Sequence, residues 1–151
     1  MVWTPHVTVA TVIEQDDHFL LVHEYADQDA AVYNQPAGHV EAGETLIAAA
    51  VRETREETAW LVEITGLLGL YVYTPPHRQD LTYYRICFIA HPLQHFAEQA
   101  LDEGIISADW IPYAQLTHMT NLRSPLVQRC IDDYRAGQRF PLHLIHEHIW
   151  L

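Results

Sequence analysis

Residues 38–60 read GHVEAGETLIAAAVRETREETAW, and this stretch decides the fold that we expect for the chain. It predicts a loop that runs into an alanine-rich helix over residues 44–59. At 100° per residue, Glu53, Glu56 and Glu57 fall within an arc of about 100° on that helix. One helix face therefore presents three carboxylates, which are the ligands that a hard cation prefers.

Acidic helix faces are commonly solvated surface, and the energetics permit that interpretation here. Like-charged pairs at this spacing cost only about 0.2–0.5 kcal/mol each, which an ordinary helix tolerates. The complete set of fixed positions argues for a functional site over a solvated surface, because six specified residues at average frequencies would coincide by chance with a probability on the order of 10⁻⁵. These positions are Gly38, Glu44, Arg52, Glu53, Glu56 and Glu57.

The spacing of this set resembles the Nudix box, Gly-x5-Glu-x7-Arg-Glu-hydrophobic-x-Glu-Glu-x-Gly-hydrophobic. The resemblance implies an enzyme that hydrolyses phosphoanhydrides linked to another moiety and that uses Mg²⁺, with Mn²⁺ as an alternative ion. Two positions depart from the pattern, because Thr54 replaces an aliphatic residue and Ala59 replaces the glycine that ends the helix. Alanine with left-handed backbone angles would cost about 1 kcal/mol. The departures bear on local geometry and remove no carboxylate.

The length of 151 residues and the hydrophobic content of 49 % predict a single domain over residues 1–151 with a sizeable core. The sequence contains no apolar run of about 18 residues and does not begin with an export signal, so we expect neither a membrane span nor export. Cys87 and Cys130 lie far apart in the sequence, and we expect no disulfide between them. The cytoplasm is the expected compartment.

The formal net charge of −12, from 20 acidic and 8 basic residues, argues against nucleic acid as a partner. A phosphate polymer would be repelled over most of the surface. A small polyphosphate differs, because a bound divalent cation reverses the local charge where the substrate docks. We therefore expect a small-molecule phosphoanhydride substrate, no nucleic-acid or membrane partner, and a monomer.

Patterns outside the box predict several strands and one further helix. Strands are expected at residues 3–14, 19–22, 61–73, 82–91 and 105–111, with loops at 25–31 and 92–104. Bends are expected at Gly66 and Gly69, and burial at Trp110. Ser124 fits the N-cap of a helix that ends near Gly137. The fold class is therefore α+β, an α/β/α sandwich around a mixed sheet, which agrees with the Nudix fold.

Mg²⁺ takes oxygen ligands and usually bridges one or two carboxylates to substrate phosphates. We expect Glu53, Glu56 and Glu57 to supply the carboxylates. The resemblance adds the backbone carbonyl of Gly38, if the loop folds back over the helix. Zinc binding is only weakly indicated by the alternating histidines of the tail, His143, His146 and His148.

Arg52 is expected to pair with Glu44 and to hold the loop against the helix, because its fork of donors suits a two-point contact with a carboxylate. Binding of a substrate phosphate is the alternative. The reaction would be attack of water on phosphorus, which also needs a base. The candidates are Glu53 and Glu57 from the helix, and Glu103 from a loop where Nudix enzymes often place an acid; a solvated loop acid is the alternative for Glu103.

Four stretches resemble one group of bacterial phosphatases within the Nudix family. They read PHVTVA at residues 5–10, NQPAGHVEAGETL at 34–46, NLRSPLV at 121–127 and GQRFPL at 137–142. This resemblance implies removal of the terminal phosphate from nucleoside tri- and diphosphates and from thiamine-type pyrimidine pyrophosphates. One alternative is a Nudix enzyme that releases pyrophosphate or two monophosphates. Another is a domain that senses a nucleotide without turnover, against which the retained glutamates argue.

Recognition of such substrates requires an aromatic surface for a flat ring and positive groups for phosphate. Tyr33 and Tyr73 are candidates to stack on the ring, and Gln35 is a candidate to bind its edge. Arg85 and Arg123 are candidates to bind phosphate oxygens. A structural role is the alternative for each of these residues.

Overall fold

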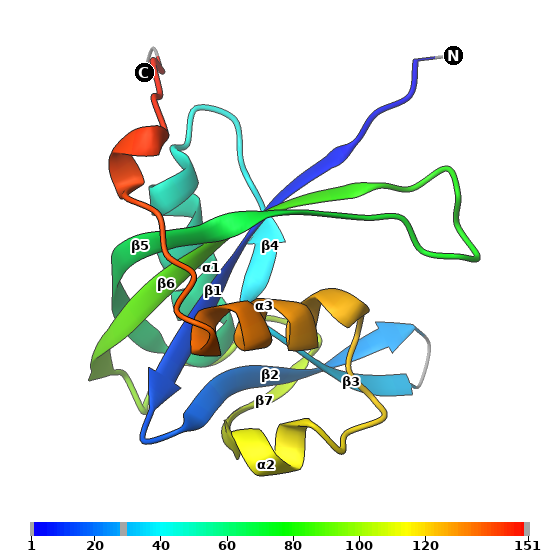
Figure 1. Ribbon diagram of the computed structural model, residues 1–151. Coiled ribbons are helices and arrows are strands. Elements are labelled where there is room, and N and C mark those ends of the chain that lie inside the picture. Colours follow the sequence, from blue (N-terminus) through cyan, green and yellow to red (C-terminus); the bar gives the residue numbers. More distant parts are fainter. Residues whose placement is uncertain (1, 28–29, 150–151) are drawn as a thin grey trace.

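A computed structural model describes residues 2–27 and 30–149 and shows a mixed sheet flanked by helices (Figure 1). The strands are β1 (His6–Gln15), β2 (His18–Asp27), β3 (Ala30–Asn34), β4 (Ala37–His39), β5 (Trp60–Tyr73), β6 (Tyr83–His95) and β7 (Ile105–Pro112). The helices are α1 (Leu46–Thr58), α2 (Tyr113–Leu116), α3 (Pro125–Arg135) and a 3₁₀ turn at Leu142–Leu144. The predicted α+β class is confirmed.

The sheet brings β4 close to β6. Its strands lie in the order β3-β2-β1-β6-β5, with β4 paired to β1 and β7 paired to β2. Among the described pairings, β1 and β6 run parallel and the others are antiparallel. Thr8 of β1 is aligned with His39 of β4 on one side and with Arg85 of β6 on the other. Residues from β4 and β6 therefore face one another across a single strand.

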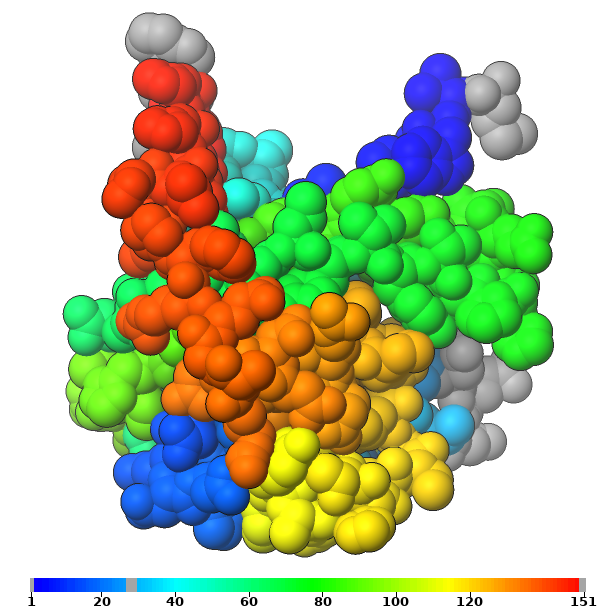
Figure 2. Space-filling view, in the orientation of Figure 1, coloured from blue at the N-terminus to red at the C-terminus, as the bar shows by residue number. Residues whose placement is uncertain are grey.

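The two faces of the sheet are covered by different helices. Val9 of β1 packs with Ala49 of α1. Its neighbour Ala10 points to the other face, as successive strand residues do, and packs in the cluster that contains Val127 and Ile131 of α3. The helices α1 and α3 therefore form the outer layers of the predicted sandwich, and Figure 2 shows α3 and the segment after it covering much of one face.

The helix α1 begins and ends close to the predicted residues. Thr45 is its N-cap, and its hydroxyl accepts a hydrogen bond from the Ala48 N–H at 3.1 Å. Ala59 ends the helix with a φ of 61°, and its N–H donates to the Arg55 carbonyl at 2.8 Å. Alanine thus occupies the left-handed position that glycine would fill without a steric penalty.

The glycine bends and the late helix are also where they were predicted. The pairing of β5 with β6 shifts register between Ile64 and Gly66 and again between Leu67 and Gly69. The Ser124 hydroxyl accepts the Leu126 N–H at 3.2 Å at the start of α3. The two cysteines are free and buried. Within the described residues, no helix has the length and apolar character needed to cross a membrane.

Several elements differ from the sequence prediction. The strand β2 continues to Asp27 and β3 begins at Ala30, so most of the loop expected at residues 25–31 is hairpin. The strand β6 continues to His95, past the expected loop start at residue 92. The prediction ended the strand too early because its last residues are mostly exposed and give no apolar pattern. Trp110 is only partly buried. The short elements β3, β4 and α2 were not predicted.

Candidate active site

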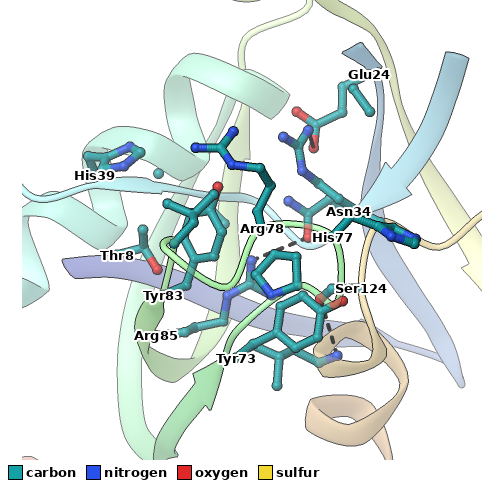
Figure 3. A pocket seen from close by; sticks show the side chains of 17 residues that line it. Thr8, Glu24, Asn34, His39, Tyr73, His77, Arg78, Tyr83, Arg85 and Ser124 are labelled. Atoms are coloured by element: carbon teal, nitrogen blue, oxygen red, sulfur yellow. Dashed lines mark hydrogen bonds and ion pairs between the residues drawn. The ribbon is translucent and has the colours of Figure 1, made fainter. Parts of the chain in front are cut away.

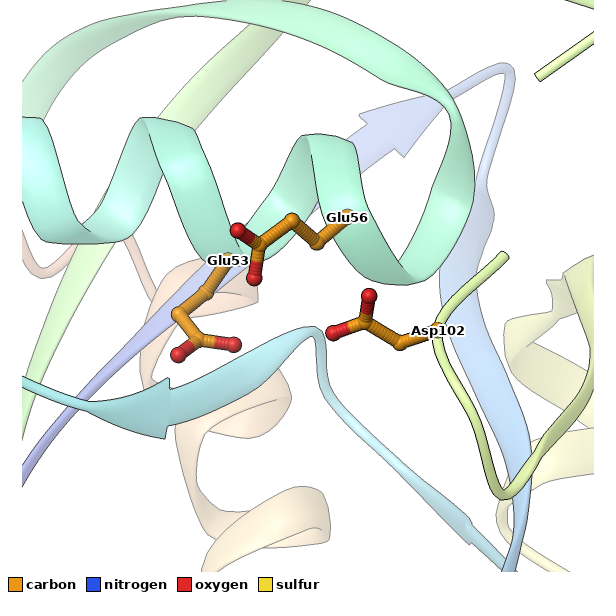
Figure 4. A group of neighbouring side chains, drawn as sticks. All are labelled: Glu53, Glu56 and Asp102. Atoms are coloured by element: carbon orange, nitrogen blue, oxygen red, sulfur yellow. The ribbon is translucent and has the colours of Figure 1, made fainter. Parts of the chain in front are cut away.

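One face of α1 and a distant loop bring three carboxylates together (Figure 4). One carboxylate oxygen from each of Glu53, Glu56 and Asp102 lies within 4.8 Å of the others. Figure 4 shows Glu53 and Glu56 extending from α1, with Asp102 approaching from the loop before β7. Three converging carboxylate oxygens form a site that suits a hard divalent cation.

The acidic loop residue of this group is Asp102, whereas the sequence prediction named its neighbour Glu103. The Asp102 N–H donates to the Glu56 carbonyl at 3.0 Å, which attaches the loop to the last turns of α1. Glu103 is exposed and lies outside the group. Glu103 therefore stays a prediction, and Asp102 is the acid that sequence reasoning passed over.

The strand β4 folds back over α1, as the resemblance implied. Gly38 lies directly against the carboxyl group of Glu53, so that a Cβ at position 38 would overlap its atoms. The N–H of the neighbouring Ala37 donates to Oε1 of Glu57 at 2.8 Å. Gly38 does not have a positive φ. The position therefore needs glycine for space rather than for its backbone conformation.

Arg52 connects this loop to the acidic face. Its Nε and Nη2 donate to the two carboxylate oxygens of Glu44 at 2.7 and 3.0 Å, which is the expected two-point contact. Nη2 also donates to the His39 carbonyl at 3.1 Å. Nη1 donates to Oε1 of Glu53 at 3.0 Å and to Oε2 of Glu56 at 3.1 Å. Arg52 therefore holds the loop and also offsets part of the negative charge of the cluster.

Arg52 contacts only part of the acidic face of α1. Its hydrogen bonds there engage one oxygen of Glu53 and one of Glu56. Within the part of the chain that the structure describes, Oε2 of Glu53 and Oε1 of Glu56 accept no hydrogen bond from the protein. Each carboxylate thus keeps an oxygen for a cation, and the donor set fits the hard, oxygen-preferring ions.

The ionised forms of two carboxylates of the site are disfavoured by burial. Burial raises the pKa of Glu57 to about 8, and nearby carboxylates add to the effect, although the hydrogen bond from Ala37 opposes it. Burial also raises the pKa of Glu53, against the influence of Arg52. A bound divalent cation would favour the ionised forms of both groups.

A cavity of about 530 Å³ opens beside this cluster (Figure 3). Gly38 lines the cavity and also contacts the Glu53 carboxyl group, so the cavity and the cluster meet at this residue. The lining includes both cationic and aromatic side chains. These are Arg78, Arg85, Arg123, His39, His77, Tyr73 and Tyr83. Such a mixture suits a ligand that has both a flat ring and negative charge.

The five predicted substrate residues do not all reach the cavity. Tyr73, Arg85 and Arg123 line it, as expected. Gln35 is only 1 % exposed and lies in the core. Tyr33 is not among the lining residues, and its ring stacks on His23 with 4.4 Å between centroids and 3° between planes. The structure therefore does not bring Tyr33 and Gln35 to the cavity surface.

Some lining residues were missed although the sequence carried a signal for one of them. Tyr83 precedes Arg85 by two positions on β6, and residues two apart on a strand share a face. The prediction for Arg85 therefore extends to Tyr83. His77 and Arg78 lie in the loop between β5 and β6, directly after two prolines, and no sequence pattern there indicated a ligand.

Known proteins are similar to this chain in sequence and in fold. The sequence profile of the NUDIX domain matches residues 4–130. Phosphatase NudJ of Escherichia coli K12 is 37 % identical over 146 residues, which are 97 % of this chain and 94 % of that protein. The solved structure of a NUDIX hydrolase from Nitrosomonas europaea matches with a TM-score of 0.92 and 40 % identity over 96 % of this chain and 98 % of the other. A MutT NUDIX hydrolase from Burkholderia pseudomallei has a TM-score of 0.71 at 17 % identity over 86 % of this chain and 98 % of the other, which shows the fold alone.

Proposed function

The chain belongs to the NUDIX hydrolase family and acts on phosphoanhydride bonds, and from this premise we propose that it is a magnesium-dependent phosphatase of small pyrophosphates. The proposed reaction removes the terminal phosphate from nucleoside tri- and diphosphates and from thiamine-type pyrimidine pyrophosphates. The contact between Gly38 and the Glu53 carboxyl group carries the proposal. Gly38 also lines a cavity with cationic and aromatic side chains, and this supports a metal site next to the substrate cavity.

In this proposal, Glu53, Glu56 and Asp102 hold Mg²⁺ or Mn²⁺, and the Gly38 carbonyl and Glu57 are the further oxygen ligands. When bound, the ion neutralises charge that develops on the phosphate oxygens. The chain itself contributes the placement of these oxygens. Arg52 fixes the carboxylates of the helix, and the Ala37 N–H fixes that of Glu57.

In this proposal, a carboxylate of the same site accepts the proton from the attacking water. Glu53, Glu57 and Glu103 remain the candidates, and we add Asp102 because it lies within the cluster. Glu57 is 9 % exposed and has only one of its oxygens engaged by Ala37. A buried carboxylate with one free oxygen is a group that can accept a proton near neutral pH.

Substrate binding is proposed for the cavity residues. Tyr73 and Tyr83 offer ring faces for the organic part of the substrate. Arg85 and Arg123 offer positive charge, although Nη1 of Arg123 already lies 3.4 Å from Oε1 of Glu24. We further propose that the protein is a single-domain monomer that works in the cytoplasm and has neither nucleic acid nor membrane as a partner. The excess of acidic residues supports the absence of a nucleic-acid partner.

A panel of nucleoside di- and triphosphates and thiamine pyrophosphate, assayed with and without Mg²⁺ and with product identification, tests the function. We expect orthophosphate, together with the substrate shortened by one phosphate. Inorganic pyrophosphate as the primary product would instead identify a pyrophosphohydrolase. Binding of a nucleotide with Mg²⁺ but without hydrolysis across the panel would identify a sensing domain.

A further inference from the structure

Arg85 is a buried cation without a counterion. Its side chain lies in β6 and the residue is 9 % exposed. Among the described residues, the arginines that form ion pairs do not include it. They are Arg52, Arg78, Arg123, Arg129 and Arg135. A charge removed from water without a partner of opposite sign is unfavourable, so its position calls for a ligand that is absent from the protein itself.

The guanidinium group is held by neutral amides and not by acids. Nη1 donates to Oε1 of Gln35 at 2.8 Å, and Nη2 lies 3.5 Å from Oδ1 of Asn34. Nε is buried and has no acceptor in the described part of the chain. The amides orient the group without neutralising it, and they leave the Nε donor uncommitted.

Gln35 is itself held in place by hydrogen bonds to core residues. Its Nε2 donates to the Thr11 carbonyl at 3.4 Å and to Sγ of Cys87 at 3.3 Å. Its Oε1 is engaged by Arg85. Both ends of the amide are therefore used within the core, and Gln35 acts on a ligand only through the arginine that it orients.

Arg85 belongs to the wall of the cavity. Arg85 is a lining residue, and Figure 3 shows its side chain directed toward Asn34 among the labelled cavity residues. The nearby acid Glu24 is paired with Arg123 at 3.4 Å. Burial lowers the pKa of Arg85, and Arg123 adds to the effect while Glu24 opposes it. An anion in the cavity would relieve this unfavourable charge.

The location of Arg85 relative to the acidic cluster indicates which part of a substrate it meets. The strand β1 separates β6 from β4, and neighbouring strands lie about 4.8 Å apart, so the backbone of Arg85 is about 10 Å from that of His39. Gly38 of β4 contacts the carboxyl group of Glu53, so the carboxylates lie at β4, two strands away from Arg85. A terminal phosphate at the carboxylates therefore leaves the next phosphate to approach Arg85.

We propose that Arg85 binds the phosphate that stays on the organic part of the substrate after cleavage, and that Gln35 is the residue that positions Arg85. The proposal rests on the proposed phosphatase function, because the phosphate in question is the one the product keeps. The fold supplies the cation and its orientation, and the substrate supplies the missing negative charge.

Calorimetric binding of the monophosphate products tests this assignment. The ligands are cytidine 5′-monophosphate and thiamine monophosphate, each compared with the unphosphorylated compound, in buffer that contains Mg²⁺. We expect Arg85→Met to weaken monophosphate binding by about tenfold or more, as the loss of a hydrogen bond to a charged group does, and to leave the unphosphorylated compounds unaffected. Arg85→Lys keeps the charge without the fork and is expected to fall between Arg85→Met and the native protein.

Two further variants make the test specific. Gln35→Glu places a carboxylate where the neutral amide oxygen contacts Arg85, so it is expected to weaken monophosphate binding selectively, which a purely structural role for Gln35 would not do. Arg129→Met removes an exposed arginine of α3 that pairs with Asp133, and is expected to change neither binding nor stability appreciably. Thermal unfolding of each variant shows that it is folded.

Unchanged monophosphate affinity in folded Arg85→Met would overturn the assignment. Equal weakening for phosphorylated and unphosphorylated ligands would also overturn it, because Arg85 would then contact the ring. A native protein that binds neither monophosphate at millimolar concentration counts against it as well. Binding requires no turnover, so an inactive protein that binds monophosphates through Arg85 would refute the phosphatase function alone.

Discussion

Gly38→Ala tests whether the acidic cluster depends on the close approach of β4 to α1. The added Cβ would overlap the carboxyl group of Glu53, whereas the backbone angles of Gly38 are ones that alanine can adopt. The substitution therefore displaces one side chain rather than straining the backbone. Arg52 donates a hydrogen bond to Oε1 of the same carboxylate at 3.0 Å. Glu53 must then leave its present position beside Glu56.

The magnitude follows from this displacement. An off-rotamer side chain costs about 0.5–1.5 kcal/mol, and a methyl group forced into a packed site costs about 1–3 kcal/mol. We expect Gly38→Ala to lose about 1–3 kcal/mol of unfolding free energy and to remain folded. A catalytic group misplaced by about 1 Å costs about 100-fold in rate. We expect a fall of that order in kcat, together with a higher Mg²⁺ requirement.

Steady-state hydrolysis at graded Mg²⁺ concentrations, with thermal unfolding of the same preparations, measures both effects. Gly137→Ala is the matched control, because its φ of 88° strains alanine while no atom lies within 4 Å of the added Cβ. It is expected to lose about 1 kcal/mol of stability and to keep its activity. If Gly38→Ala kept kcat within about twofold of the native value, the reasoning on Glu53 would be refuted, since the displaced carboxylate would then not matter.

Glu57→Gln is expected to leave the fold intact and to lower kcat by about 100-fold or more. The control Glu63→Gln, at an exposed site on β5, should keep full turnover. Near-native activity of Glu57→Gln would contradict a role of Glu57 in catalysis. In EDTA, thermal stability should fall as pH rises from about 5 toward 8. The folded pKa of Glu57 is about 8 against an ordinary 4.5, so the folded state holds the extra proton, and the slope is at most about 1.4 kcal/mol per pH unit. The Glu57→Gln variant should flatten this slope, and an equal slope in both proteins would exclude Glu57 as its source. Ala59→Gly should raise the free energy of unfolding by about 1 kcal/mol in denaturant melts, because position 59 has a φ of 61°; a lower midpoint would contradict this.

The parts of the site that depend on local spacing were predictable from the sequence. Residues three and four apart share a helix face, so the carboxylates of α1 could be placed before the structure was known. The contact of Arg52 with Glu44 followed from the shapes of the two side chains. The helix predicted over residues 44–59 agrees with α1, which has Thr45 as its N-cap and Ala59 as its C-cap. In each case the deciding interaction lies within one helix and the loop before it.

The parts that depend on distant contacts were not predictable. Asp102 and Glu103 are adjacent acids, and the choice between them is made by the hydrogen bond from the Asp102 N–H to the Glu56 carbonyl. Gln35 is an amide in a polar stretch, and only the approach of Arg85 from β6 gives it a buried partner. Tyr33 meets His23 through strand pairing of β2 with β3. Local sequence patterns do not show which residues distant in the sequence come into contact.

The departure at Thr54 from the family pattern supports the site instead of weakening it. Thr54 is 0 % exposed and lies between the acidic positions of α1 on the face that packs on β1. Its hydroxyl is 2.9 Å from that of Thr11, so the polar group that replaces an aliphatic side chain is satisfied within the core. A directional bond of this kind fixes the rotation of α1 on the sheet more narrowly than an aliphatic contact would. Rotation by one residue, about 100°, would carry Glu53 away from Gly38, so the hydroxyl pair and the carboxylate cluster specify the same orientation of the helix.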